Sequence, residues 1–196
     1  MRRSIELSDP RSLRALAHPT RVALVGLLRQ HGSLTATEAA RLLKLDSGSC
    51  SFHLRQLARF GLVEEAGAQG RRKPWRATAR VTSWPGMATD PEMESALQLL
   101  SGIVAQRYAQ VVQEWLNTRS GEPQDWQRAA WFGDMLLHLT PDELTELGLQ
   151  IEQLVAPYEQ RVFEPESRPA GSRLVTALHI AIPREPDAVN RGEESS

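Results

Sequence analysis

The chain has 196 residues, 23 Lys and Arg against 24 Asp and Glu, and one cysteine, Cys50. This length is enough for one large domain or two small domains with a buried core. A single cysteine excludes an intramolecular disulfide and a zinc site built from cysteines. No apolar run reaches the ~20 residues that span a membrane, and no signal-peptide core is found, so we expect a soluble, cytoplasmic protein without a membrane partner.

The charges are distributed unevenly along the chain. Residues 1–80 contain 15 Lys and Arg against 6 Asp and Glu, whereas residues 81–196 contain 8 against 18. The net charge is therefore +9 in the first part and −10 in the second. A basic half joined to an acidic half indicates that only the first faces nucleic acid. Charges that cluster by chance on a solvated face would give the same counts.

Two short helices joined by a tight turn are predicted at residues 36–45 and 46–57. The second begins after Asp46 or Ser47, whose side-chain oxygens suit the N-cap. One face of this second helix is apolar, and the other carries polar and cationic groups on a rod that fits a DNA major groove. We interpret the pair as a helix-turn-helix whose second helix reads DNA. The predicted DNA-binding side chains are Ser47, Ser49, Ser51, Phe52, His53, Arg55 and Gln56.

Several of these positions allow two interpretations. Arg55 can read guanine and Gln56 adenine, and either can instead reach a phosphate. His53 contacts DNA or packs beside the helix-turn-helix core, and Phe52 contacts a thymine methyl or covers the neighbouring hairpin. Cys50 lies on the apolar face, where a small core residue is expected rather than a redox centre.

Local signals also place the helices that precede this motif. Asp9 and Pro10 suit the N-cap and first position of a short helix. A second helix is predicted from residue 19 to about residue 30, and Gly32 ends it because glycine tolerates left-handed backbone. Thr35 with Glu38 three residues later forms a capping box.

A β-hairpin with a basic tip is predicted after the reading helix. Its strands lie at 62–66 and 71–78, around a Gly-containing turn. Because the cationic residues follow a reading helix, we expect them to bind the DNA backbone, although a solvated charge run has the same pattern. These predicted phosphate contacts are Arg71, Arg72, Lys73 and Arg76.

The longest predicted helix covers residues 92–116, after a linker at 81–91. Its apolar stripe is longer than a small domain requires, which indicates a partner helix in a homodimer. Packing on the C-terminal segment is the alternative. The predicted dimerisation residues are Met93, Leu97, Leu100, Val104, Tyr108, Val111 and Trp115.

The C-terminal region is predicted as a small α/β unit. A helix from Thr140 to about Val162 is expected, and the alternation of Leu174 to Ile182 predicts a strand. Part of 129–139 is taken as its partner strand, although helix and strand fit that segment equally, and residues 186–196 are expected to be disordered. Aromatic residues here are core residues or candidates for an effector pocket. The candidate ligand residues are Trp115, Trp126, Trp131 and Tyr158.

We expect no enzyme. Asp134 and His138 are four residues apart, but no nucleophile, oxyanion donor or phosphate-binding loop accompanies them. No cofactor is expected either.

The motifs of the first eighty residues are spaced in a recognisable order. They are Leu16-Ala17-His18-Pro19-Thr20-Arg21, Ser51-Phe52-His53-Leu54-Arg55-Gln56-Leu57, Gly61-Leu62-Val63 and Arg71-Arg72-Lys73-Pro74-Trp75-Arg76. Residues 1–80 resemble a winged helix of the ArsR type, which implies a dimeric transcriptional regulator on inverted-repeat operators. Residues around Leu139–Leu144 are similar to the C-terminal region of actinobacterial members, which implies little about a ligand.

One departure from that family concerns metal. Its metal-sensing members carry cysteine pairs in the helix before the turn, or Asp and His sets on the C-terminal helix. Residues 36–45 contain no cysteine, and no such His spacing is found between 90 and 117. We therefore expect no metal site.

The expected fold class is α+β and mainly α: a winged helix-turn-helix at 1–80, a long dimerisation helix, and a small α/β region within 92–185. The expected function is sequence-specific regulation of transcription by a homodimer on double-stranded DNA, as a repressor. Two alternatives stay open: a winged helix that binds protein, and a regulator that responds to a small-molecule effector.

Overall fold

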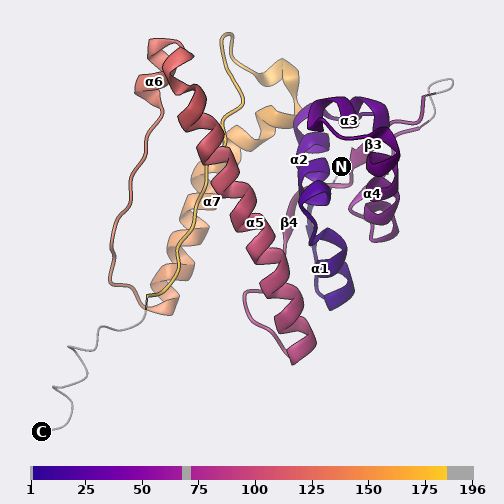
Figure 1. Ribbon diagram of the computed structural model, residues 1–196. Helices are drawn as coiled ribbons and strands as arrows, with labels where there is room; N and C mark the ends of the chain where they lie inside the picture. Colours follow the sequence, from indigo (N-terminus) through magenta and orange to yellow (C-terminus); the bar gives the residue numbers. More distant parts are fainter. Residues whose placement is uncertain (1, 68–71, 185–196) are drawn as a thin grey trace, which may run out of the picture.

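The computed structural model describes residues 2–67 and 72–184 of the chain (Figure 1). Arg71 of the predicted hairpin and the predicted disordered tail 186–196 lie outside these ranges. The elements in chain order are β1 (Arg2–Glu6), α1 (Pro10–Leu16), α2 (Pro19–His31), α3 (Ala36–Leu43), α4 (Ser47–Arg59), β2 (Val63–Glu65), β3 (Trp75–Ala77), β4 (Ala79–Ser83), α5 (Pro91–Thr118), α6 (Gln124–Ala129) and α7 (Pro141–Phe163), with short 3-10 turns at Arg119–Gly121 and Pro165–Ser167.

The fold is mainly helical with a small amount of sheet, as predicted. The N-caps are confirmed at four helices. Asp9 accepts from the amides of Arg11 and Ser12 at 3.0 Å, and Asp46 accepts from the Ser49 amide at 2.7 Å. Full capping boxes form at the starts of α3 and α7. These contacts satisfy amides that have no partner inside the helix, so the helix starts follow directly from the local sequence.

The capping box of α3 yields a stability prediction. The Thr35 hydroxyl accepts from the Glu38 amide at 3.2 Å, and the Glu38 carboxylate accepts from the Thr35 amide at 2.8 Å. Thr35→Ala removes one half of this pair, so we expect the free energy of unfolding to fall by about 1 kcal/mol in urea denaturation. Thr37→Ala, an exposed threonine on the same helix, is the control, and an equal loss there would contradict the role of the cap.

Two small sheets flank the helices. β2 and β3 pair antiparallel with Val63 opposite Ala77, which confirms the predicted hairpin. β1 pairs with β4 in parallel, with Ser4 opposite Val81. This second sheet was not predicted, because its strands lie more than seventy residues apart and neither carries a strong local signal.

A half-buried arginine joins α2 to β4. Arg29 donates to the Ala79 carbonyl at 3.1 Å and to the Thr82 hydroxyl at 2.6 Å. Burial lowers the pKa of this guanidinium to about 10. The two acceptors satisfy a cation that has left water, so Arg29 fixes β4 against α2.

The core is built from residues 7–100. Its buried members come from α1 to α5 and both hairpin strands, and they include Met93, Leu97 and Leu100 of the long helix. α5 packs on α1. The core therefore extends beyond the predicted boundary at residue 80, and β4 enters the predicted linker 81–91 as far as Ser83.

The C-terminal strands are a correction. Residues 130–140 and 173–184 carry no strand, and within the described chain their backbone forms no ladder. The small C-terminal α/β region is therefore wrong for the single chain: its described part contains helices and extended segments. No buried residue is found after Leu100 among the described residues. No described helix has the length and apolar character needed to cross a membrane.

Candidate nucleic-acid interface

α4 has one apolar face and one polar face, as predicted. Cys50, Leu54 and Leu57 are fully buried in the core, and Phe52 and Arg55 are exposed on another side of the helix. Burial raises the pKa of the Cys50 thiol, and the Asp46 carboxylate adds to the rise. A buried thiol that resists ionisation is a core residue, which agrees with the predicted structural role.

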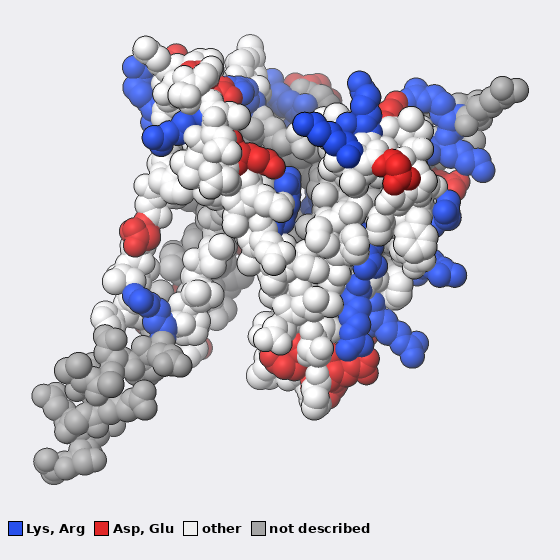
Figure 2. Space-filling model, in the orientation of Figure 1, with Lys and Arg blue, Asp and Glu red and all other residues white. Residues whose placement is uncertain are grey.

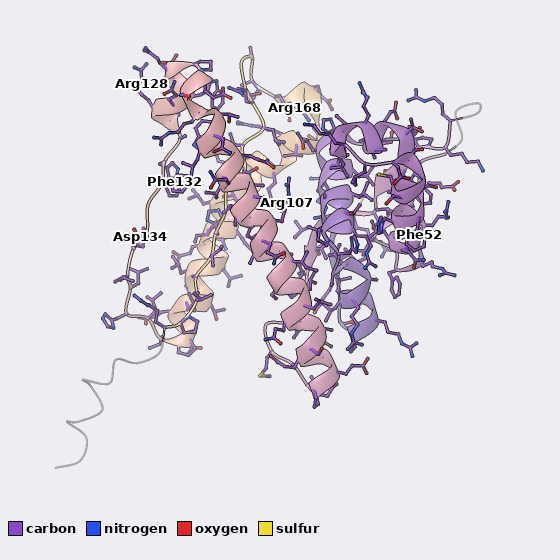
Figure 3. All side chains as sticks on the ribbon, viewed as in Figure 1. Phe52, Arg107, Arg128, Phe132, Asp134 and Arg168 are labelled. Carbon is purple, nitrogen blue, oxygen red and sulfur yellow. The ribbon has the colours of Figure 1, made fainter. Side chains whose placement is uncertain are left out.

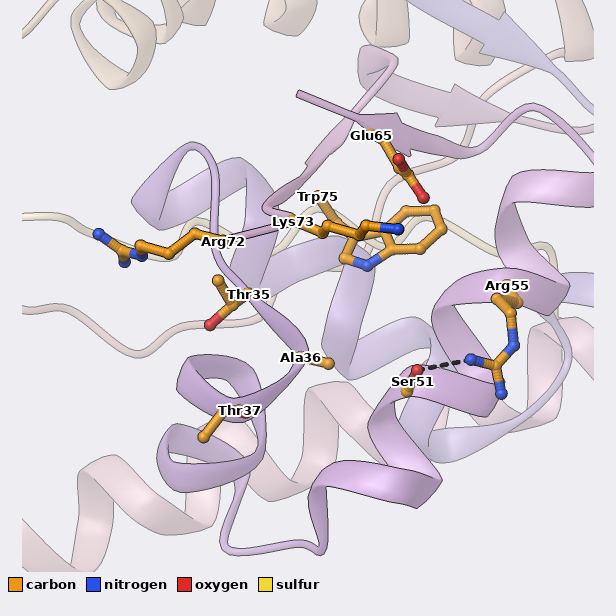
Figure 4. A pocket seen from close by; sticks show the side chains of 9 residues that line it. All are labelled: Thr35, Ala36, Thr37, Ser51, Arg55, Glu65, Arg72, Lys73 and Trp75. Carbon is orange, nitrogen blue, oxygen red and sulfur yellow. Dashed lines mark hydrogen bonds between the residues drawn. The ribbon is translucent and has the colours of Figure 1, made fainter. Parts of the chain in front are cut away.

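A groove of about 570 Å³ lies between α4, the start of α3 and the hairpin (Figure 4). Ser51 and Arg55 border it from α4, Thr35 and Thr37 from the α3 start, and Trp75 from β3. The cations Arg72 and Lys73 of the hairpin also line it. The structure thus brings some of the predicted DNA-binding residues of α4 and of the hairpin to one concave surface.

Hydrogen bonds orient two of the arginines. Arg55 donates to the Ser51 hydroxyl at 2.7 Å, one turn earlier on α4, and this bond is drawn in Figure 4. Arg76 pairs with Glu64 across the hairpin at 2.8 Å. Both guanidinium groups are exposed, so their remaining N–H donors are accessible to a phosphate or a base.

Arg72 is held by a carboxylate that the sequence did not identify as its partner. It pairs with Glu38 of α3. Hydrogen bonds from the Thr35 amide and hydroxyl lower the pKa of the Glu38 carboxyl, and the charge of Arg72 lowers it further. Glu38 therefore stays ionised and holds the Arg72 guanidinium beside the start of α3. The helix dipole at this end of α3 also favours an anion.

A family of helix-turn-helix domains matches residues 16–66. The match begins at the end of α1 and covers α2, α3, α4 and β2. Residues 16–66 form a helix-turn-helix domain. Comparison with curated proteins finds no match for the chain.

Positive charge gathers on this helix-turn-helix domain. Figure 2 shows Lys and Arg side chains over α1 to α4 and the hairpin, whereas carboxylates occupy the start of α5. The acidic residues at that end are Asp90, Glu92 and Glu94. The charge difference read from the sequence is therefore also a spatial one, which favours DNA contact by the helix-turn-helix domain.

His53 lies on a different side of α4 from Arg55. Its ring packs against His18 at 4.5 Å between centroids and against Phe52 at 5.4 Å. Its Nδ1 is buried without a hydrogen-bond partner in the described structure. His18 Nδ1 accepts from the Thr20 amide at the start of α2. The packing alternative for His53 is thus the arrangement found, and Phe52, half exposed beside it, covers this histidine pair.

The histidine pair makes stability depend on pH. Burial lowers the pKa of His18 and of His53, and the Arg21 charge lowers both further, as does His18 for His53. The unfolded chain therefore binds more protons as pH falls below about 6.5, and the free energy of unfolding decreases there. His53→Gln should lose less stability between about pH 7.5 and pH 5.5 in urea denaturation. His31→Gln, exposed on α2, is the control, and an equally large effect there would contradict the assignment.

The other predicted DNA-binding residues of α4 are distributed around it. Ser47 is exposed, and Ser49 and Gln56 are half-buried. The sequence did not identify the α3 start or Trp75 as part of the groove. The capping box was a usable signal for the former, because it marks a helix N-terminus beside the reading helix.

The predicted dimerisation residues divide into two groups. Met93, Leu97 and Leu100 are buried inside the chain, where α5 packs on α1, so the core already uses them. The later positions are half-buried on the rest of α5. They are Val104, Tyr108, Val111 and Trp115.

The predicted ligand residues are exposed or half-buried in the described chain. Trp131 and Tyr158 are 80% and 60% exposed. Trp126 and Trp115 are half-buried, and Arg173 lies over the Trp126 ring at 5.1 Å. The described residues contain no group of three or more His, Cys, Asp or Glu placed to hold a metal ion.

Proposed function

We propose that the protein is a sequence-specific DNA-binding regulator of transcription that acts as a homodimer. α4 enters the major groove, and the hairpin binds the adjoining backbone. The observation that carries this proposal is the shared groove: Arg55 of α4 and Arg72 and Lys73 of the hairpin line one concave surface, which also holds the Glu65 carboxylate. Rigid presentation of a polar helix face beside flanking cations is what major-groove recognition requires.

The sign of regulation and the operator symmetry rest on the ArsR resemblance. That resemblance implies a repressor on an inverted repeat. An inverted-repeat operator has two-fold symmetry and is bound by a dimer with the same symmetry. The half-buried apolar stripe at Val104, Tyr108 and Val111 supports a partner helix on α5. A role on DNA also implies the cytoplasm as the compartment. The proposal involves no enzymatic reaction and no cofactor.

Selection of bound DNA from a random library tests the proposal. We expect enrichment of a sequence with two related half-sites, whose spacing reports the dimer geometry. Enrichment of a single half-site would contradict the dimer, and no enrichment at low salt would contradict sequence-specific DNA binding. A winged helix that binds protein instead would give this last result.

The hairpin contacts have their own test. In a salt titration on random DNA, log K should fall linearly with log salt concentration, with about 0.9 of slope per phosphate contact. Arg72→Ala and Lys73→Ala should each reduce the slope by about 0.9 and weaken binding to all sequences equally. Arg128→Ala on α6 is a matched control of the same type. An unchanged slope in both hairpin variants would exclude their phosphate contacts.

One observation favours an effector-responsive form of this function. A second groove, of about 540 Å³, lies between α2, the α3–α4 turn and α5. Leu27, Leu45 and Ile103 supply apolar surface, and Lys44 and Arg107 supply charge. A ligand there would link the reading motif to the long helix. A thermal-shift screen tests this, since a ligand of the native state must raise its melting temperature, and no stabilising compound would argue against it.

A further inference from the structure

Two nine-residue segments of the C-terminal region are extended and unpaired. Residues 131–139 join α6 to α7, and residues 174–182 follow the turn after α7 (Figure 1). No backbone hydrogen bond of either segment is found within the described chain. In the single chain these amides and carbonyls face water, and any apolar contact that excluded water would require them to be paired.

Their side chains are too apolar to remain in water. Trp131, Met135 and Leu136 are 80%, 76% and 76% exposed, and Ile180 and Ile182 are 64% and 75% exposed. Figure 3 shows Phe132 on the first segment, which joins α6 to α7. Asp134 is the one formally charged residue of both segments, and neither contains proline. Low charge, no proline and high β-propensity describe strands that pair or aggregate.

Apolar side chains line one face of each segment, and in the first segment Phe132 and Leu136 are apolar on the other face as well. Trp131, Met135, Leu137 and Leu139 share one face of the first, and Leu174, Leu178, Ile180 and Ile182 share one face of the second. His138 and His179 fall on the opposite faces. Each segment would span about 30 Å as a strand. The structure has no strand at either segment, so a ladder would need a partner beyond the single chain.

We propose that residues 131–139 and 174–182 pair with the same segments of a second copy of this chain, forming an intermolecular β-sheet. A second copy is favoured because both segments are apolar and low in charge, because neither has a ladder within the described chain, and because a two-fold contact covers both copies at once. The inference rests on the proposed homodimer. It places the main interface in the C-terminal region rather than at Met93, Leu97 and Leu100, which the core of each chain already uses.

Cross-linking tests whether the pairing joins two chains. His138→Cys and His179→Cys are made in separate full-length chains, mixed, refolded together and treated with a short bismaleimide. We expect a covalent dimer on a denaturing gel, formed by the mixture or by either variant alone. Native Cys50 is fully buried, so the unmodified chain is the blank. Ser33→Cys, exposed on the helix-turn-helix domain, controls for random collision.

The double variant distinguishes pairing within one chain. If His138→Cys/His179→Cys closes only into a cross-linked monomer, the two segments pair in the same chain and the proposal is wrong. No cross-link above the Ser33→Cys control would overturn it as well.

Proline substitution gives an independent readout. The amides of Leu136 and Leu137 bond to nothing within the described chain, so proline there removes no bond from a single copy. In a ladder, adjacent amides point to opposite edges, and at least one of Leu136→Pro and Leu137→Pro loses a bond. We expect that variant to raise the dimer dissociation constant at least about tenfold relative to its alanine counterpart, by sedimentation equilibrium.

The outcomes separate this inference from the proposed function. Proline variants that dimerise as tightly as the alanine variants would overturn the sheet while leaving the α5 dimer and DNA binding intact. A wild-type chain that is monomeric at all concentrations would remove the homodimer itself. DNA selection, which depends on α4, reports on the proposed function separately.

Discussion

Replacing Arg55 with alanine is expected to weaken binding to the selected operator by about 5- to 150-fold, which corresponds to about 1–3 kcal/mol. Arg55 is exposed on α4, and the Ser51 hydroxyl accepts a hydrogen bond from one of its nitrogens at 2.7 Å. A guanidinium oriented in this way can bind guanine O6 and N7 together. The measurement is fluorescence anisotropy on the operator and on random DNA at one salt concentration.

The ratio of the two affinities identifies the kind of contact. Losing a base contact lowers the affinity for the operator more than the affinity for random DNA, whereas losing a phosphate contact lowers both affinities equally. Arg128→Ala removes the same charge from α6 and should change neither affinity. A variant Arg55→Ala that binds the operator as tightly as the wild type would contradict the placement of α4 in the groove. Ser51→Ala should show a smaller loss, because it only orients the arginine.

Leu54→Ala is expected to lower the free energy of unfolding by about 3 kcal/mol, within the 2–5 kcal/mol range of buried leucines. Leu54 is fully buried, next to Arg55 in sequence and on the opposite, core side of α4. Truncation removes its apolar contacts and leaves a cavity in a close-packed core. Urea denaturation followed by circular dichroism gives the value.

Leu99→Ala provides the comparison for this core prediction. Leu99 is 50% exposed on α5, so the same truncation should change stability by less than about 0.5 kcal/mol. Equal losses in both variants would mean that α4 does not pack as described. Operator affinity of Leu54→Ala, corrected for its unfolded fraction, should stay close to that of the wild type.

Local chemistry explains the features that could be predicted. The N-caps at Asp9, Thr35, Asp46 and Thr140 depend on side chains within three residues of the amides they bind. Helical periodicity likewise repeats over one or two turns. Gly32 ends α2 with a φ of 77°, a conformation that glycine adopts without strain. Helix positions and the buried face of α4 therefore followed from the sequence.

Strand pairing depends on partners far along the chain, and here prediction was less complete. β1 pairs with β4 across more than seventy residues, and no local pattern specified it. The alternation of residues 174–182 predicted a strand, and part of 129–139 was taken as its partner, but the structure has no strand at either segment. Which segments pair into a ladder depends on the contacts of the whole folded protein.

The sequence by itself determined the starts of the capped helices, the core face of α4 and the division of charge, because short-range hydrogen bonds, helical period and composition carry that information. The tertiary structure alone decided three further matters. It turned His53 toward His18, paired Arg72 with Glu38, and buried Met93, Leu97 and Leu100 inside the chain. Each depends on which elements meet in space, and that choice is made by packing between residues distant in sequence.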